Sequence, residues 1–300
     1  MRALDPEVGD AVWAAVAGRV PSAPDRHPLG CHKPRISDRV CFNGILIRLV
    51  TGCSWESAER LLGGVVSDTT LRSRRDEWTV GGVFDAVFEE ALAAYDKIIG
   101  LDFTEVAVDG SLQKSPCGGE GTGKNPTDRA KLGWKWSVLT DRNGIPFGWV
   151  IDGANRNDSI LLAATLDDAD SRGLLAEIET IWLDRGYDSD ATRQRLADRS
   201  IDDAVIAKKR KKGQATGKNP QKMGMRWPVE RTNSWLSNYG QLRRNTDRHP
   251  IRRLAQLALA VVLLLTAKLI DWRNRWVRHE APWNRAEMKG LRLRPVAAGR

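Results

Sequence analysis

Three acidic residues lie where predicted elements begin or end, and the carboxyl ends of sheet strands are common places for reactive groups. Asp109 ends a strand predicted for residues 104–109, and Asp184 follows a strand predicted for residues 180–183. Glu230 lies 46 residues further along, at the start of a predicted helix. If the two strands are neighbours and the helix packs beside them, the three carboxylates converge.

Converging carboxylates are unfavourable on their own, because like charges raise one another's pKa, and they become favourable when hard divalent cations take oxygen ligands from them. Mg²⁺ is the expected ion, with Mn²⁺ as a substitute. Two such ions about 4 Å apart activate an attacking oxygen and stabilise a leaving oxygen in displacement at phosphorus. Asp109, Asp184 and Glu230 are therefore candidate metal ligands for phosphodiester chemistry.

The elements that must position these residues follow from the periodicity of the sequence. Strands are predicted at 104–109, 134–140, 145–151, 180–183 and 203–207, with the hairpin signal Asp141-Arg142-Asn143-Gly144 between the second and third. Helices are predicted after Asp158, after Ser189 or Asp190, from about Val229, and from Pro250 to Trp276. This order predicts a ribonuclease H-like domain, a mixed five-stranded sheet flanked by helices, with a generic α/β domain as the alternative.

Residues 36–99 carry a helical pattern that precedes this domain. One helix begins near Ser37 and ends at Gly52, a second begins at Ser54, and Ser67 or Asp68 caps a third. The third helix carries Arg72, Arg74 and Arg75. Three short helices with a basic third one predict a helix-turn-helix-like DNA-binding domain, and the alternative is a packing domain whose arginines form a solvated face. Residues 1–35 are predicted to be an arm, and residues 277–300 a basic tail.

Several motifs together resemble those of the DDE transposases of the insertion sequence 5 group, found in bacterial mobile elements. The resemblance runs from about Phe42 to Trp276 and includes Asn43–Leu46, Thr51–Trp55, Val-Asp109-Gly-Ser, Gly118–Gly123, Gly153–Asp158, Asp184–Asp188 and Arg226-Trp-Pro-Val-Glu230-Arg-Thr-Asn-Ser-Trp-Leu. It implies that Asp109, Asp184 and Glu230 form a metal-binding triad in a catalytic domain at 100–276. In the related pattern Y-x2-R-x3-E-x6-K, Arg226 and Glu230 match, whereas Met223 and Ser237 replace the tyrosine and the final lysine.

The resemblance also implies the partners of the protein. They are double-stranded DNA, both the terminal inverted repeats of the element and the target, and further copies of the same chain in a homodimer or higher oligomer. The expected reaction is strand cleavage followed by strand transfer. Two alternatives remain open, a nuclease on the same fold that cuts without joining and a transposase-derived DNA-binding protein that no longer catalyses.

Positive charge is concentrated in one part of the chain. The whole sequence has a net charge of +9, whereas residues 208–253 hold 14 Lys or Arg against Glu230 and Asp247. A local cluster of this kind is typical of a DNA-contacting surface. Beyond the third helix, the candidate DNA contacts are Lys124, Lys208, Lys209, Arg210, Lys211, Lys212, Arg226, Trp227, Arg231, Arg243 and Arg244.

Other classes of function fit the sequence poorly. The four cysteines lack disulfide or zinc-ribbon spacing, and the glycine-rich segment ending at Lys124 has Asn125 where a nucleotide-binding loop needs Ser or Thr, so no nucleotide cofactor is expected. The apolar run 254–267 is short for a bilayer, and no secretory leader is recognised at the N-terminus. We expect a cytoplasmic, nucleoid-associated protein with no membrane partner.

Overall fold

The computed structural model describes residues 3–21, 35–208 and 226–279. Its N-terminal part is helical, with α1 Pro6–Ala17, α2 Asp38–Thr51, α3 Trp55–Leu61, α4 Asp68–Val80 and α5 Val83–Ile98. Ser54 and Ser67 cap α3 and α4 through their hydroxyl groups, and Gly52 ends α2 in the left-handed conformation. These caps agree with the boundaries that the sequence predicts.

A mixed sheet follows the helical part. Its strands are β1 Glu105–Lys114, β2 Gly123–Lys124, β3 Leu132–Thr140, β4 Pro146–Gly153, β5 Thr180–Leu183 and β6 Asp203–Ile206. β3 pairs antiparallel with both β1 and β4, whereas β1, β5 and β6 run parallel. The resulting order β4-β3-β1-β5-β6 is that of a ribonuclease H-like sheet, which confirms the predicted fold class.

The sheet differs from the prediction in two places. β1 does not end at Asp109 but continues to Lys114, because β3 pairs with it up to Lys114 opposite Gly133. β2 is a sixth strand of only two residues, which pairs with β3 at Gly133 and Leu132. A two-residue strand in a glycine-rich segment has no periodicity from which it could be predicted.

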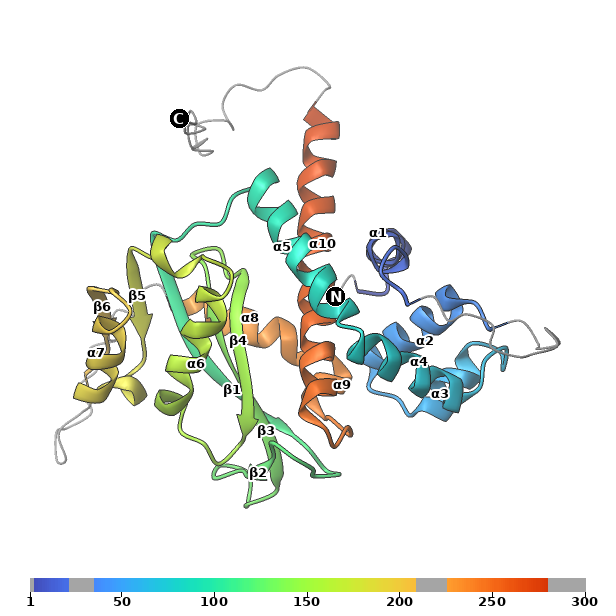
Figure 1. The fold of residues 1–300 in the computed structure, drawn as a ribbon, viewed down its shortest axis with the longest axis horizontal. Coiled ribbons are helices and arrows are strands. Elements are labelled where there is room, and N and C mark those ends of the chain that lie inside the picture. The colour runs from blue at the N-terminus through green and yellow to red at the C-terminus, as the bar shows by residue number, and fades with distance from the viewer. Residues whose placement is uncertain (1–2, 22–34, 209–225, 280–300) are drawn as a thin grey trace.

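Helices cover both faces of the sheet (Figure 1). On one face α6 Asp158–Asp170 packs on β3 and β4, and Thr165 donates a hydrogen bond to the Ser137 hydroxyl. On the other face α8 Trp227–Ser237 packs on β1 and β3, where Asn233 accepts a hydrogen bond from Trp136. The remaining helices are α7 Asp190–Ala197 and α9 Gly240–Arg243, with short 3-10 helices at Leu175–Glu177 and Arg185–Tyr187.

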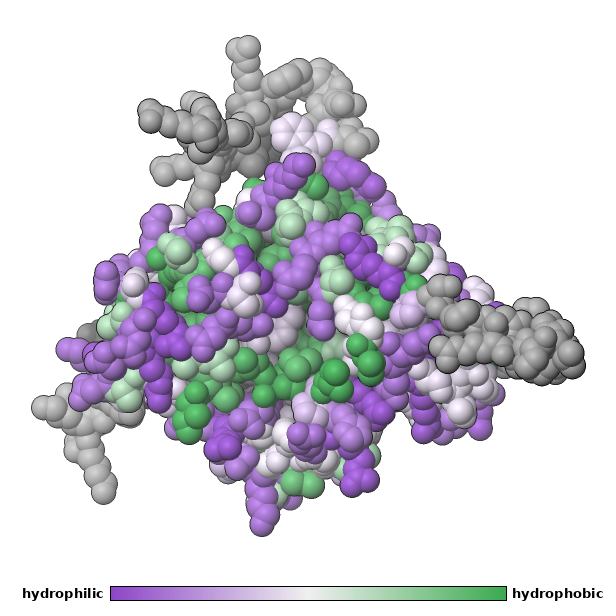
Figure 2. Space-filling view, viewed as in Figure 1, coloured by the Kyte–Doolittle hydropathy of each residue, from purple (hydrophilic) through white to green (hydrophobic). Residues whose placement is uncertain are grey.

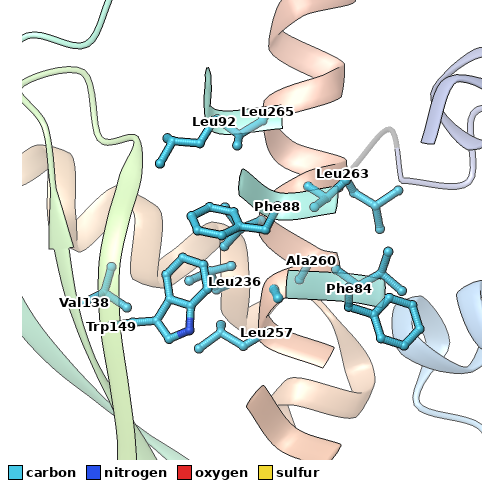
Figure 3. Packing of buried hydrophobic residues seen from close by; sticks show 14 of the residues in the cluster. Phe84, Phe88, Leu92, Val138, Trp149, Leu236, Leu257, Ala260, Leu263 and Leu265 are labelled. Carbon is cyan, nitrogen blue, oxygen red and sulfur yellow. The ribbon is translucent and has the colours of Figure 1, made fainter. Parts of the chain in front are cut away.

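The long helix α10 Pro250–His279 lies between the sheet and the N-terminal helices. Figure 3 shows Phe84, Phe88 and Leu92 of α5 meeting Leu257, Ala260, Leu263 and Leu265 of α10, with Trp149 of β4 and Leu236 of α8 beside them. All of these side chains are buried in one continuous apolar cluster. The N-terminal helices therefore share a core with the sheet.

By length and composition alone, α10 is apolar enough to cross a membrane. In the structure, however, 61% of its most apolar window is buried inside the protein. Leu257, Ala258 and Leu259 at its centre are each no more than 1% exposed. Packing against α5, α1 and β4 thus accounts for the apolar run, as the prediction of a core helix requires.

Candidate active site at the open edge of strand β1

The parallel pairing of β1 with β5 is shorter than β1 itself. It covers Glu105 to Ala107, so the edge of β1 that faces β5 is open where Asp109 lies. Asp184 directly follows β5, and it accepts a hydrogen bond from the Gly186 backbone N–H in the turn that it caps. In the parallel register Ala107 is opposite Trp182, and continuing this register by two residues puts Asp109 beside Asp184.

Glu230 reaches the same opening from α8, and Arg226 connects it to Asp184. The Arg226 guanidinium Nη2 lies 3.4 Å from Glu230 Oε1 and 3.9 Å from Asp184 Oδ2. Glu230 is in the first turn of the helix, one turn after Arg226. One guanidinium therefore lies between two of the three predicted carboxylates and offsets part of their charge.

The Asp109 carboxyl has a raised pKa. Burial is the largest cause, the charges of Asp158 and Asp184 add to it, Arg226 and the Gly110 N–H oppose it, and the net pKa is about 6. The buried Tyr187 is close to the same carboxylates. Burial is the main cause of its raised pKa, and the negative charges of Asp158, Asp109 and Asp184 raise that pKa as well. The structure thus brings Asp109 and Asp184 into one electrostatic cluster with a fourth carboxylate, Asp158.

Asn233 holds Asp109 in place, and sequence reasoning did not select it. Its amide nitrogen donates a 2.9 Å hydrogen bond to Asp109 Oδ2, and its amide oxygen accepts a 2.8 Å bond from Trp136 Nε1. Asn233 lies three residues after Glu230, which puts both side chains on one face of α8. That spacing is the signal from which its role could have been inferred.

Asp158 is held on the other side of β1 by a buried lysine. Lys135 Nζ donates to Asp158 Oδ1 at 2.7 Å and to the Arg156 carbonyl at 2.9 Å, and Lys135 is only 4% exposed. The Asp158 carboxylate occupies the space above Gly110, where a Cβ would lie 2.0 Å from Oδ1. Glycine after Asp109 is therefore required by this close approach.

The arginines predicted as DNA contacts in the third helix, α4, have mostly structural surroundings. Arg74 is 5% exposed and paired with Asp38 and Glu77, and Arg75 is 3% exposed with Asp76 and Asp247 as partners. Both guanidinium groups are therefore engaged inside the protein, and their contact with DNA stays a prediction. Arg72 is exposed, but it is already paired with Glu56 and Asp68.

The predicted contacts around α8 differ in availability. Trp227 is 47% exposed. The Arg231 guanidinium lies 4.3 Å from the Trp227 ring and 4.5 Å from the Trp235 ring, and it donates a hydrogen bond to the Asn143 carbonyl. Arg231 is thus engaged within the protein, whereas one face of the Trp227 side chain is open to solvent.

The other predicted basic contacts are spread over several elements, among them β2 and α9. Lys124, Lys208, Arg243 and Arg244 are exposed, and no ion pair to an acidic side chain is formed by any of them within the described part of the chain. Lys209, Arg210, Lys211, Lys212 and Met223 lie outside the described residues. Ser237, at the position of the expected basic residue, accepts a hydrogen bond from Gln113.

Carboxylate oxygens are the ligands that Mg²⁺ and Mn²⁺ prefer, so the donor set of Asp109, Asp184 and Glu230 fits a divalent ion. In residues 3–21, 35–208 and 226–279 no group of three His, Cys, Asp or Glu side chains is already arranged around a metal position. Arg226 supplies positive charge between Asp184 and Glu230 instead. A divalent ion at these carboxylates would replace that charge.

Comparison with known proteins identifies the family that this arrangement resembles. A family model described as "Transposase DDE domain" matches residues 96–265, and one described as "Putative transposase of IS4/5 family" matches residues 8–88. The "Putative transposase for insertion sequence element IS402" of Burkholderia cepacia is 37% identical over 148 residues, which are 48% of this chain and 67% of that protein. Among solved structures, the "Mos1 transposase paired-end complex with left transposon end" aligns with 85% of this chain and 84% of that chain, at 11% identity and a TM-score of 0.25.

Proposed function

The chain belongs to the DDE transposases of the IS4/5 group, and from that premise we propose that it cleaves DNA at the ends of an insertion sequence and joins them to target DNA. Asp109, Asp184 and Glu230 are the proposed catalytic and metal-binding residues. Two observations support the proposal: Arg226 lies between Asp184 and Glu230, and Asn233, three residues after Glu230 on α8, donates a hydrogen bond to Asp109.

The proposed reaction has two displacements at phosphorus in one site. Water attacks the phosphodiester at the element end, the bond to the 3′ oxygen breaks, and a free 3′-hydroxyl results. That hydroxyl then attacks a phosphodiester of the target, whose own 3′ oxygen leaves. When bound, two Mg²⁺ ions, or Mn²⁺ in their place, supply activation of the attacking oxygen and charge stabilisation of the leaving oxygen.

The residues of the chain would prepare this site. Asn233 holds Asp109 Oδ2 through its amide N–H, and the turn at Gly186 fixes Asp184. Arg226, released from Asp184 and Glu230, would neutralise a phosphate of the bound strand. Trp227, which is exposed one residue after Arg226, is the proposed stacking partner for an unpaired base.

Double-stranded DNA is the proposed partner, with terminal inverted repeats and target DNA bound by exposed basic residues. Lys124, Lys208, Arg243 and Arg244 keep this role, and Lys209–Lys212 are proposed to extend it. A homodimer or higher oligomer on paired ends, magnesium dependence and a place in the bacterial nucleoid also belong to the proposal.

The test is to incubate the purified protein with element-end DNA, an unrelated target and Mg²⁺, and to size the cleaved and joined products. We expect both products from the wild type, and neither from Asp184→Asn, because an amide cannot replace the charge of a metal-binding carboxylate. Asp202→Asn, which alters an exposed acid outside the site, should behave as the wild type.

The other outcomes separate the alternatives. Cutting without joining would favour a nuclease on this fold. Binding without cutting, with any divalent ion, would favour a DNA-binding protein that no longer catalyses. Equal products from the wild type and Asp184→Asn would show that the chemistry occurs elsewhere.

A further inference from the structure

A second group of exposed cations lies at the C-terminal end of β1, beside α9. Lys114 ends β1 opposite Gly133 of β3, and it forms a backbone bridge with Arg244 at the end of α9. The Asn245 N–H donates to the Lys114 carbonyl at 2.9 Å. Lys124 lies on β2, which pairs with the same part of β3.

The glycine-rich loop 118–123 completes this surface, and a buried arginine holds it there. Arg253 donates hydrogen bonds to the carbonyls of Gly118, Glu120 and Asp247 at 3.1, 2.6 and 2.8 Å. Arg253 is fully buried. Its guanidinium therefore connects the loop to the segment before α10 without offering charge to solvent.

Only glycine fits where this loop meets the next segment. Gly119 has a φ of 108°, and a Cβ there would lie 2.2 Å from the Arg248 carbonyl oxygen. The contact brings exposed Arg248 beside the loop. Glycine at this position therefore allows the loop 118–123 to pack closely against the segment that carries Arg248.

Basic side chains outnumber acidic ones on this surface, where the loop itself carries the exposed Glu120. Lys114, Lys124, Arg243, Arg244 and Arg248 are exposed, and within the described residues none forms an ion pair with an acidic side chain. Asp247, in the same segment, is buried and paired with Arg75. In Figure 2 the lower tip of the molecule, over β2 and its flanking loops, is mainly hydrophilic. The surface has the charge and backbone exposure that suit a polyanion.

We propose that this surface, formed by Lys114, Lys124, Arg244, Arg248 and the loop 118–123, binds backbone phosphates of the duplex whose scissile phosphate lies at Asp109. The inference rests on the proposed function and adds a second anchoring point to it. Five residues of β1 separate Asp109 from Lys114, which corresponds to about 17 Å. For a duplex whose axis runs along β1, at about 3.4 Å per base pair, this distance puts the contact about five base pairs, or half a helical turn, from the cleaved bond.

The fixed distance between the carboxylate site and the basic surface indicates which DNA the surface binds. Because β1 joins the two sites rigidly, the surface would contact a duplex that is already bound at the carboxylate site. In the first step that duplex is the element end, before any target is present. The proposal therefore predicts an effect on binding and cleavage of the element end alone.

The experiment compares the triple variant Lys114→Gln/Arg244→Gln/Arg248→Gln with a control triple, Arg19→Gln/Arg273→Gln/Arg275→Gln. The control removes the same charge from exposed positions after α1 and on α10, outside residues 36–99. On a long element-end duplex we expect the surface triple to weaken binding at least about tenfold and to lower the salt slope by about two to three, since each lost phosphate contact removes about 0.9. The control triple should bind as the wild type does.

Modified duplexes locate the contact. Two shortened duplexes are used, each of which ends two base pairs beyond the scissile phosphate, one on either side. Only the duplex shortened on the side that reaches the surface should bind more weakly to the wild type. The affinity of the surface triple should be the same for the long duplex and for this shortened one. A neutral methylphosphonate about five base pairs from the cleaved bond should act in the same way, because the charge partner is then missing from the DNA.

The outcomes distinguish this inference from the proposed function. If the wild type binds and cleaves the element end while both triples match it, the surface has no such role. If the surface triple loses only joining to target and cleaves normally, the surface binds target DNA and the inference is wrong. If the wild type binds no duplex, both proposals fail.

Discussion

At the scale of single residues, Asn233 couples the carboxylate of β1 to the helix that carries Glu230. Its amide group is used at both ends, since the nitrogen donates to Asp109 and the oxygen accepts from Trp136. Trp136 is fully buried on β3, so the amide cannot rotate without leaving a buried donor unpaired. The contact fixes the orientation of the Asp109 carboxylate at the open edge of β1.

Asn233→Ala tests this role. We expect kcat for end cleavage to fall about 10- to 100-fold, the usual effect of losing a group that orients a metal-binding carboxylate. KM for DNA should change little, because Asn233 faces the protein. The affinity for the divalent ion, measured by calorimetry, should fall in parallel. An unchanged melting temperature would show that this loss does not come from unfolding. Ser234→Ala, an exposed neighbour on α8, serves as the control, and unchanged affinity in Asn233→Ala would argue against the role.

Sequence reasoning could select Asp109, Asp184 and Glu230 because each follows or begins a predicted element, and element order is visible in periodicity. It could not select Asn233 or Lys135 in the same way. Both act through contacts across the sheet or between a helix and the sheet, and a buried lysine paired with Asp158 looks like any polar residue of a strand. The burial of Arg74 and Arg75 could not be predicted for the same reason, because the sequence of a basic helix does not reveal which of its sides is buried.

At the scale of elements, a buried charged cluster joins α2 and α4 to the segment before α10. Arg48 of α2 and Arg75 of α4 both face Asp247, at 3.9 and 3.0 Å. The Trp55 ring lies 4.4 Å from the Arg48 guanidinium, and Gly52 packs directly on Gly240 of α9. Arg75, which the sequence suggests as a DNA contact, thus takes part in connecting the N-terminal helices to the segment before α10.

Asp247→Ala tests the strength of this junction. Removing one partner of a buried ion pair leaves uncompensated charge, so we expect the free energy of unfolding to fall by about 3–5 kcal/mol at pH 7. Burial alone would raise the pKa of Asp247, but Arg75, Gln256 and Arg48 outweigh it and hold the pKa below its ordinary value. The stabilisation is therefore present above the unfolded pKa and is lost as pH falls through the folded one.

Urea unfolding at several pH values measures this effect. The difference between wild type and Asp247→Ala should be largest near neutral pH and should shrink below about pH 4, the pKa of an unfolded aspartate. Asp202→Ala, an exposed acid, gives the baseline. A difference that stays constant down to low pH would mean that the ion pairs with Arg48 and Arg75 contribute nothing, and that only packing is lost.

At the scale of the whole molecule, each chain has one proposed carboxylate site, whereas an insertion sequence has two ends. The boundaries at residues 36, 100 and 277 remain predictions, because α10 packs on α5 and α1 as well as on the sheet, within a continuous core. Alternating patterns predict which residues are buried, but not that helices distant in sequence share one core. Each chain is therefore expected to act as a rigid unit on one DNA end.

Mixing experiments can show whether two such units are required. Wild type and Asp184→Asn are combined in equal amounts before element-end DNA is added, so that mixed assemblies form. If joining of a pair of ends needs an intact site in both chains of a dimer, the yield of paired joined product falls to about a quarter of the wild-type yield, since only that fraction of dimers has two intact sites. If each chain acts alone, the yield falls only to one half, and the homodimer proposal is then wrong even though the carboxylate site is right. Sizing the protein with and without DNA provides the control, because complexes with twice the 33.4 kDa mass of the chain should appear with element ends and not with unrelated duplex.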